Sequence, residues 1–247
     1  MALSENVTVK VASLGKSTAK TNVRLYSYSD HLLLKSEASE LRKGRRTELK
    51  IQWAASELLA QIPLDSLKVQ DICAHLSIAQ GTLYLYFPDR DRLLEVLLEG
   101  FVEYLREHLE RATQHSVTSA DSMRLATLTY CKLFEVNRGL MKCLLNHFET
   151  FPEARKIHQD FNRAWIETVV DAVKKRRGKS NRSKRTSDVE LTRRAYALGG
   201  MVDQYLSYLY LYNDANVTAT AGDTNAVVKT LTFIWSQTFR QEFDDAE

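Results

Sequence analysis

The segment at residues 78–87, IAQGTLYLYF, gathers side chains that can make hydrogen bonds: the amide of Gln80, the hydroxyl of Thr82 and the phenols of Tyr84 and Tyr86. In the DNA major groove amide side chains pair with adenine, and hydroxyl groups reach phosphate oxygens. On one face of a helix this set would suit sequence-specific DNA contact. The alternative is a β-strand, because Thr, Tyr and Phe favour strands.

The apolar spacing around this segment favours the helix. Leu83 and Phe87 are four residues apart, and Ile78 falls in the turn before them. These side chains can share a core with Ile72 and Leu76 of the preceding segment. A strand would place neighbouring apolar residues on opposite faces and would need a partner strand that the sequence does not offer. The helix leaves the following residues around its free surface: Gln80, Thr82, Tyr84, Leu85 and Tyr86.

The flanking segments, which must position this helix, also have a helical period. Between Glu48 and Ile62 apolar residues recur at i, i+3, i+4 and i+7, and Pro63 stops the pattern. A second short helix follows, and Pro88-Asp89 starts a long one. Three short helices followed by a long one form a helix-turn-helix arrangement. The apolar face of the second helix is made by Val69, Ile72, Cys73 and Leu76.

Across residues 51–93 the sequence resembles, without a gap, the TetR family of transcriptional regulators. The family pattern V-x-D-I-A corresponds to VQDIC at 69–73, and G-T-L-Y-x-H-F corresponds to GTLYLYF at 81–87. The segment PDRDRLL then opens the fourth helix, as in the family. The resemblance implies an all-α fold in which an N-terminal three-helix, helix-turn-helix DNA-binding unit joins a larger helical ligand-binding and dimerisation domain.

The chain departs from the family pattern at four positions. Pro63 and Ser77 each replace a glycine, Ala79 replaces a Ser or Thr, and Tyr86 replaces a His. Ser77 must then adopt a backbone conformation that glycine tolerates better. Ala79 removes the capping side chain at the start of the recognition helix. These changes make the operator sequence unpredictable by analogy.

The resemblance also implies which residues touch DNA. Gln80 is the expected base reader, Lys68 and Arg90 would hold phosphates, and Arg45 and Arg46 would form an N-terminal arm that reaches phosphate or the minor groove. The complete predicted DNA-binding set is Arg45, Arg46, Lys68, Gln70, Gln80, Gly81, Thr82, Tyr84, Tyr86 and Arg90.

Three parts are expected along the chain: a mobile N-terminal extension (1–41), in which residues 23–34 could form a short element, a TetR-type DNA-binding domain (42–105, with the helix-turn-helix motif at 68–87) and a helical ligand-binding and dimerisation domain (106–247). The basic stretch 174–185 is either a solvated helix end and loop or a second electrostatic contact for DNA. We expect five helices in the body, at 119–137, 139–149, 152–177, 188–212 and 223–243. The segment 213–223 between the last two is expected to be a polar loop.

Large aromatic and flexible side chains in the body could line an adaptable cavity for a hydrophobic or aromatic small molecule, although plain core packing is the alternative for each. The last two helices, which include Gly199-Gly200, would pair with a second copy in a four-helix homodimer interface. The predicted ligand-binding set is Phe134, Met141, Leu144, Phe148, Phe161, Trp165, Met201 and Tyr205.

Other function classes have little support in the sequence. Its 3 cysteines lack a CxxC pair, which fits the reducing cytoplasm, and no signal-like or membrane-spanning apolar run occurs. The 6 histidines lack metal-ligand spacing and catalytic motifs are missing, so we expect no enzyme, metal or cofactor. Because the net charge is only +3, DNA binding must depend on where the charges lie.

The sequence therefore predicts a ligand-responsive, homodimeric regulator that binds a double-stranded DNA operator, as a repressor released by a hydrophobic small molecule. The alternative is a helical small-molecule-binding or scaffolding homodimer that has lost specific operator binding, which the departures at Ser77 and Ala79 would allow.

Overall fold

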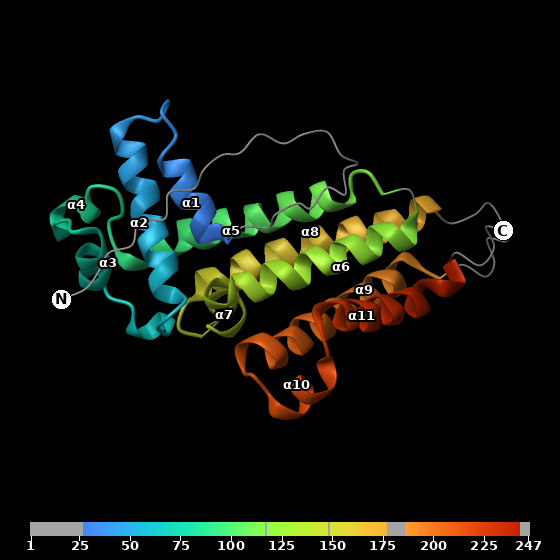
Figure 1. The fold of residues 1–247 in the computed structure, drawn as a ribbon. Coiled ribbons are helices and arrows are strands. Elements are labelled where there is room, and N and C mark those ends of the chain that lie inside the picture. The colour runs from blue at the N-terminus through green and yellow to red at the C-terminus, as the bar shows by residue number, and fades with distance from the viewer. Residues whose placement is uncertain (1–26, 117, 148, 177–185, 243–247) are drawn as a thin grey trace, which may run out of the picture.

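The structure is a computed structural model that describes residues 27–116, 118–147, 149–176 and 186–242. This described part is built from helices without a strand. One end of the molecule holds the N-terminal helices, and the long helix α5 leads from there along the body (Figure 1). These first elements are α1 (Tyr28–Ser36), α2 (Lys43–Leu59), the short 3-10 turn η1 (Leu64–Ser66), α3 (Val69–Leu76), α4 (Gln80–Tyr84) and α5 (Arg90–Thr113).

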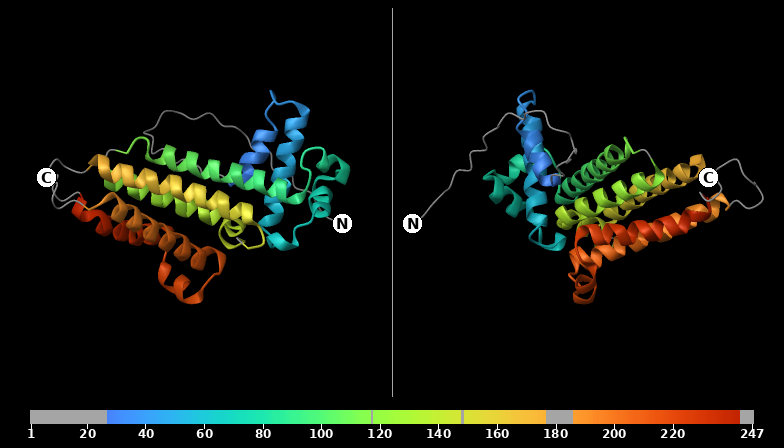
Figure 2. Two further views of the ribbon diagram at one scale, coloured as in Figure 1. Left: turned by 180° about the vertical axis from the view of Figure 1, so that it is seen from behind. Right: turned by 45° about the vertical axis from the view of Figure 1, so that its right-hand side comes forward.

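The body packs its long helices along α5. In both further views α6 and α8 lie alongside α5, while α9 and α11 form a second layer beside them (Figure 2). The prediction of an all-α chain with an N-terminal helix-turn-helix unit and a larger helical body is confirmed. The elements of the body are α6 (Ser119–Val136), α7 (Arg138–Asn146), α8 (Pro152–Arg176), α9 (Asp188–Leu206), the π-helical turn η3 (Ser207–Leu211), α10 (Ala215–Ala221), α11 (Thr224–Phe239) and the 3-10 turn η4 (Arg240–Glu242).

One predicted loop of the body contains a helix instead. The segment 213–223 forms α10, because the Asp214 carboxylate accepts hydrogen bonds from the backbone N–H groups of Asn216 and Val217 and so caps its start. Gly222, at a φ of 67°, ends it. Most of the basic stretch 174–185 lies outside the described residues.

The expected mobile extension is wrong for residues 28–36, which form α1 and pack onto α2. Tyr28 and Leu32 are four residues apart, so a helix turns both toward the core, where they are buried. The backbone N–H of Tyr28 donates to Asn137 Oδ1 at 2.7 Å, which ties α1 to the junction between α6 and α7. Residues 1–26 lie outside the described part of the chain.

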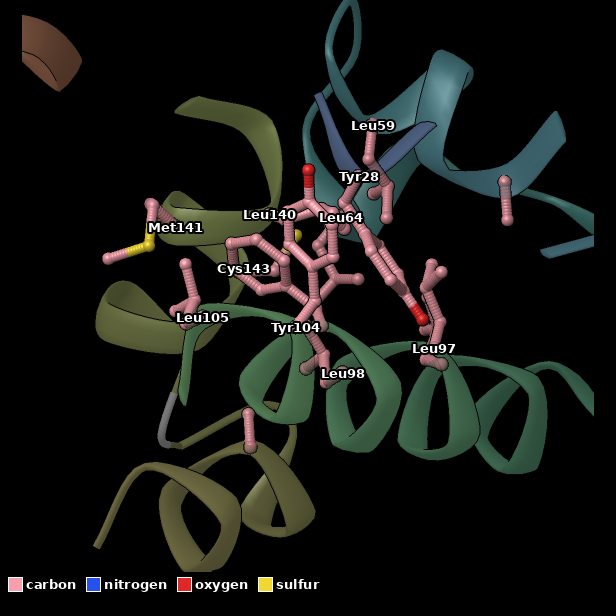
Figure 3. Packing of buried hydrophobic residues seen from close by; sticks show 14 of the residues in the cluster. Tyr28, Leu59, Leu64, Leu97, Leu98, Tyr104, Leu105, Leu140, Met141 and Cys143 are labelled. Carbon is pink, nitrogen blue, oxygen red and sulfur yellow. The ribbon is translucent and has the colours of Figure 1, made fainter. Parts of the chain in front are cut away.

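A shared hydrophobic core joins the DNA-binding unit to the body (Figure 3). Its side chains converge from α1, α2, η1, α5 and α7, and most of them are nearly inaccessible to solvent. We call this set the junction core, and its labelled members are Tyr28, Leu59, Leu64, Leu97, Leu98, Tyr104, Leu105, Leu140, Met141 and Cys143. The two predicted domains therefore meet through buried apolar contact, and their exact boundary stays a prediction.

Candidate nucleic-acid interface and internal cavity

The turn between α3 and α4 has the geometry that a helix-turn-helix requires. Ser77 ends α3 in the left-handed region, at φ 54° and ψ 44°, as the sequence predicts. For a residue with a β-carbon this conformation costs roughly 1–2 kcal/mol. Backbone hydrogen bonds offset the cost, because the N–H of Ile78 donates to the carbonyl of Cys73 at 3.0 Å and that of Ser77 to the carbonyl of Ala74 at 3.2 Å.

The N-terminus of the short helix α4 has no side-chain cap, so the packing of its apolar residues must hold the helix in place. Ala79 at the N-cap accepts the N–H of Thr82 through its carbonyl at 2.9 Å, but it has no side-chain group to offer. Leu83 and Phe87 are buried, and the N–H of Phe87 donates to the Leu83 carbonyl at 3.0 Å. The β-strand alternative is thus wrong, and apolar contact alone sets the orientation of the recognition helix.

The exposed face of α4 consists of two pairs at i, i+4 spacing: Gln80 with Tyr84, and Gly81 with Leu85. Tyr84 is 47% exposed and Leu85 is 83% exposed, which is high for large apolar side chains. A leucine and a tyrosine on such a face can contact the methyl group of thymine, and the glutamine can pair with adenine. We call these four residues the recognition face.

The other two predicted contacts on this helix are less open. Thr82 and Tyr86 are half-buried on the flank of α4. The phenol of Tyr86 lies over Gly44 in the first turn of α2, and its ring packs against the core. Tyr86 therefore helps to hold α4 against α2, and its predicted contact with DNA stays a prediction.

Lys68 and Gln70 lie at the start of α3 with exposed side chains, on the same unit as the recognition face. The backbone N–H of Lys68 donates to the Asp71 carboxylate at 3.1 Å, so the lysine side chain extends from a capped helix start. Arg90 is more constrained. Its guanidinium donates to the Leu67 carbonyl at 3.3 Å and pairs with Asp91, which fastens the start of α5 to the residue just before α3.

The predicted N-terminal arm does not exist as an arm, because Arg45 and Arg46 lie in the first turns of α2. Arg46 donates to the backbone carbonyls of Ala38 at 3.1 Å and Ser39 at 2.9 Å, so it secures the connection from α1 to α2. Arg45 is paired with Glu48 and remains about half exposed. A phosphate contact by either arginine stays a prediction, but it would come from a helix.

The recognition face carries no cation. Between Val69 and Asp89 the sequence contains neither Lys nor Arg. The exposed cations stand on its flanks instead, at Lys43 and Lys50 of α2 and at Lys68. This arrangement separates uncharged groups that can read bases from charged groups that can hold phosphates.

Gly81 provides a direct test of this surface. A β-carbon added there would meet nothing within 4 Å. Because alanine favours a helix, Gly81→Ala should leave the free energy of unfolding in urea unchanged or raise it by up to about 1 kcal/mol. The same variant should weaken binding to operator DNA, measured by fluorescence anisotropy, because the methyl group stands on the recognition face. A loss of stability would show that the exposed face is assigned wrongly.

A second feature is a partly open cavity of about 420 Å³ between α5, α6, α8, α9 and α11. Its wall is largely apolar and aromatic, with Phe161, Trp165, Trp235 and Phe239 among the lining residues. Two members of the predicted ligand-binding set, Phe161 and Trp165, are thus brought together here.

The other predicted ligand-binding residues lie elsewhere. Phe134 of α6 and Met141 and Leu144 of α7 are buried in the core and do not line this cavity. Helix α7 packs toward α2, α5 and α8 instead. Met201 and Tyr205 are half-buried and pack against the core. Phe148 lies outside the described residues. Of the predicted ligand-binding set, this cavity therefore contains Phe161 and Trp165, and a ligand contact by the other members stays a prediction.

A polar cluster in the cavity wall was missed by reasoning from the sequence. The Tyr130 hydroxyl donates to Asp203 Oδ1 at 2.6 Å, and His158 Nε2 lies 3.7 Å from Asp203 Oδ2. Burial, reinforced by the charge of Asp203, raises the pKa of Tyr130 well above its usual value, so the phenol stays a neutral donor. The only signal in the sequence was a single acid within the apolar run at 197–212.

A metal cluster, a membrane-spanning helix and a reactive thiolate are each absent from the described part of the chain. It contains no group of three or more His, Cys, Asp or Glu side chains that could hold a metal ion. No helix there is long and apolar enough to cross a membrane. Burial raises the pKa values of Cys131 and Cys143 to about 12, so neither thiol is a reactive thiolate at neutral pH.

Comparison with known proteins agrees with this geometry. Residues 52–97 match the family model described as bacterial regulatory proteins, tetR family. The nucleoid occlusion factor SlmA of Serratia proteamaculans is 25% identical over 149 residues, which cover 58% of this chain and 75% of that protein. The same factor of Vibrio atlanticus is 27% identical over 146 residues, covering 56% and 74%.

Solved structures show the same fold over most of the chain. Salmonella enterica GusR superposes with a TM-score of 0.63 at 19% identity, covering 82% of this chain and all (100%) of that one. The fatty acid degradation regulator FadR from Bacillus halodurans gives a TM-score of 0.62 at 14% identity, covering 79% and 96%. A TetR-family regulator from Rhodococcus sp. gives 0.59 at 17% identity, covering 78% and 99%.

Proposed function

We propose that this chain is a homodimeric, ligand-responsive transcriptional repressor. The premise is its match to the DNA-binding domain of the TetR family at residues 52–97, together with the fold that it shares with TetR-family structures. The observation that carries the proposal is the recognition face: an uncapped but firmly packed helix that presents Gln80, Gly81, Tyr84 and Leu85 to solvent. Exposed leucine and tyrosine on a short helix have no role in the core of the free chain. Contact with base edges gives them one.

The chemistry of this face constrains the operator. Arginine paired with guanine is the commonest specific contact in protein–DNA complexes, and the recognition face has no arginine. Gln80 suits adenine, and Leu85 suits the thymine methyl group. We expect A·T pairs at the central positions of each half-site, with Lys68 and the cations of α2 on the flanking phosphates.

Dimerisation through α9 and α11 has support from their exposed faces. Exposed residues recur every four positions on α9 and its π-helical extension, at Tyr196, Gly200, Gln204 and Tyr208. Phe233 of α11 is 62% exposed. A β-carbon at Gly200 would meet nothing, so this part of α9 is open to a second helix. In such a dimer the half-sites would lie about one turn of DNA apart or somewhat more.

Helix α5 offers a direct route from the cavity to DNA. Its 24 residues span about 36 Å, from the capping Asp89 beside α4 to Thr113 in the cavity wall. A ligand that binds one position of α5 more tightly than another would shift the distance between the two recognition helices of a dimer. If the ligand binds more tightly to the position of α5 that does not fit the operator, it lowers the affinity for DNA and ends repression.

The proposal is tested by binding to the DNA upstream of the protein's own gene. We expect a sequence-specific complex at moderate salt, and Gln80→Ala should weaken it by about 1–3 kcal/mol for each half-site. Gln61→Ala is the matched control, because Gln61 is an exposed glutamine outside α3 and α4. A folded dimer that forms no specific complex would instead support the alternative, a ligand-binding or scaffolding protein without an operator.

A further inference from the structure

The cavity between α5, α6, α8, α9 and α11 has a single acid in its wall, with His158 as its one basic neighbour among the described lining residues. Among the described residues that line it, Asp203 is the only acid, and neither Lys nor Arg is present. The rest of the wall is apolar, aromatic or neutral and polar, apart from His158. A carboxylate surrounded by so little polar surface interacts strongly with whatever charge comes next to it, because the local dielectric constant is low.

Asp203 retains hydrogen-bonding capacity toward the cavity. A carboxylate offers about four acceptor positions. One is taken by the Tyr130 hydroxyl at 2.6 Å, and His158 Nε2, at 3.7 Å, is too far for a direct hydrogen bond. The Asp203 side chain is 22% exposed, and it belongs to the cavity wall. A ligand with an N–H donor can therefore reach it.

The aromatic wall favours the same ligand chemistry. Phe161, Trp165 and Trp235 line the cavity. Aromatic faces attract cations through the ring quadrupole, and Trp does so best. An anionic group would meet the Asp203 charge in a wall whose only basic side chain among the described lining residues is His158, which already lies beside Asp203.

Taking the cavity as the effector site of the proposed repressor, we propose that it selects an apolar or aromatic molecule with one protonated amine, held by Asp203. At about 420 Å³ the cavity lies within the range of roughly 300–1,000 Å³ typical of small-molecule sites. Tyr130 fixes one carboxylate oxygen and leaves the other side of the group for the ammonium. The amine adds a direct hydrogen bond and a full positive charge on the cavity side of Asp203, beside His158 Nε2 at 3.7 Å.

The test uses three naphthalene probes of nearly equal size: 1-naphthylmethylamine, 1-naphthylmethanol and 1-naphthoic acid. The chain has 3 tryptophans, and Trp165 and Trp235 line the cavity. In the full-length Trp53→Phe variant, quenching of tryptophan fluorescence then reports on the cavity alone. We expect the amine to bind at least about tenfold more tightly than the alcohol, and the acid to bind most weakly.

Asp203→Asn keeps an acceptor for Tyr130 but removes the charge, so it should reduce the affinity for the amine to that for the alcohol. Affinity for the alcohol should not change, which also shows that the cavity is intact. Asp160→Asn is the matched control, because Asp160 is an acid on α8 that pairs with Lys156 and Arg163 outside the cavity. The inference is overturned if no probe binds, if the acid binds as tightly as the amine, or if the preference for the amine survives Asp203→Asn.

Because these titrations contain no DNA, their failure is distinct from failure of the repressor proposal. A preference for amines with no effect on operator binding would keep the cavity chemistry and overturn the proposed ligand release. Specific operator binding with no preference for amines would keep the regulator and overturn the assignment of Asp203.

Discussion

Gly139→Ala is expected to lower the free energy of unfolding by about 2–3 kcal/mol, because overpacking at a site without room costs of this order. A β-carbon at Gly139 would lie 2.3 Å from the carbonyl oxygen of Leu59 and 2.8 Å from the Cα of Ala60. These are backbone atoms, so no rotation of a side chain can relieve the clash. Helix α7 would have to move away from the end of α2, which opens the junction core between the DNA-binding unit and the body.

Urea unfolding followed by circular dichroism measures this effect. Gly81→Ala is the matched control, since the same substitution at a site without neighbours should not destabilise the protein. The intrinsic preference of alanine for helices favours Gly139→Ala by about 1 kcal/mol, so any net loss reports the clash. Equal stability of the variant and the parent protein would mean that α7 and α2 are not packed as described.

Tyr28→Ala is expected to cost about 3–5 kcal/mol, the range measured when a large buried aromatic side chain is truncated. The Tyr28 side chain is 4% exposed, and its ring centroid lies 5.2 Å from that of Tyr104 and 5.6 Å from that of Phe101. Its loss leaves a cavity between α1 and α5 and removes the main apolar contact of α1. Part of the cost disappears if α1 detaches and water fills the space.

Tyr28→Phe separates the ring from its hydroxyl and should stay within about 1.5 kcal/mol of the parent protein. Leu34→Ala is a second control on α1, because Leu34 is 58% exposed. Limited proteolysis gives an independent measurement, since detachment of α1 in Tyr28→Ala should expose the α1–α2 connection to cleavage. Comparable stability of the alanine and phenylalanine variants would show that α1 contributes little to the junction core.

Both substitutions act on the surface through which a ligand in the cavity would influence DNA binding. The junction core joins α2 of the DNA-binding unit to α7 of the body, while α5 is common to both parts. A variant that loosens this core without unfolding the recognition unit should retain DNA binding and lose the response to ligand. Coupling between ligand binding and DNA binding needs a packed element that has more than one stable position. A loosened core has no such defined positions and cannot transmit the change.

The helix-turn-helix could be predicted because local patterns determine it. Leu83 and Phe87 at i, i+4 spacing with Ile72 required a helix pair, and Pro88-Asp89 marked the start of α5. The left-handed conformation of Ser77 and the missing cap at Ala79 also followed from single positions in the motif. Most helices of the body were found for the same reason, since their apolar period extends over many residues.

Contacts between distant residues could not be predicted this way. Arg46 appeared as part of a DNA-binding arm, but the carbonyls of Ala38 and Ser39 engage it once α1 folds onto α2. Met141 appeared as a lining residue of a ligand site, but α7 turns it into the core. In both cases the residue type was compatible with two roles, and the tertiary contacts show the structural one, while the predicted DNA or ligand contact stays a prediction.

The amino-acid sequence by itself therefore determined the helical class, the recognition helix and the residues available to read DNA, because these depend on spacing within one or two turns. Only the tertiary structure decided that α1 belongs to the core, that Tyr86 packs against the core beside Gly44, and that the cavity wall combines Asp203 with Tyr130. The last two residues are 73 positions apart in the chain. Their meeting depends on how α6, α8 and α9 pack, and no local pattern encodes that arrangement.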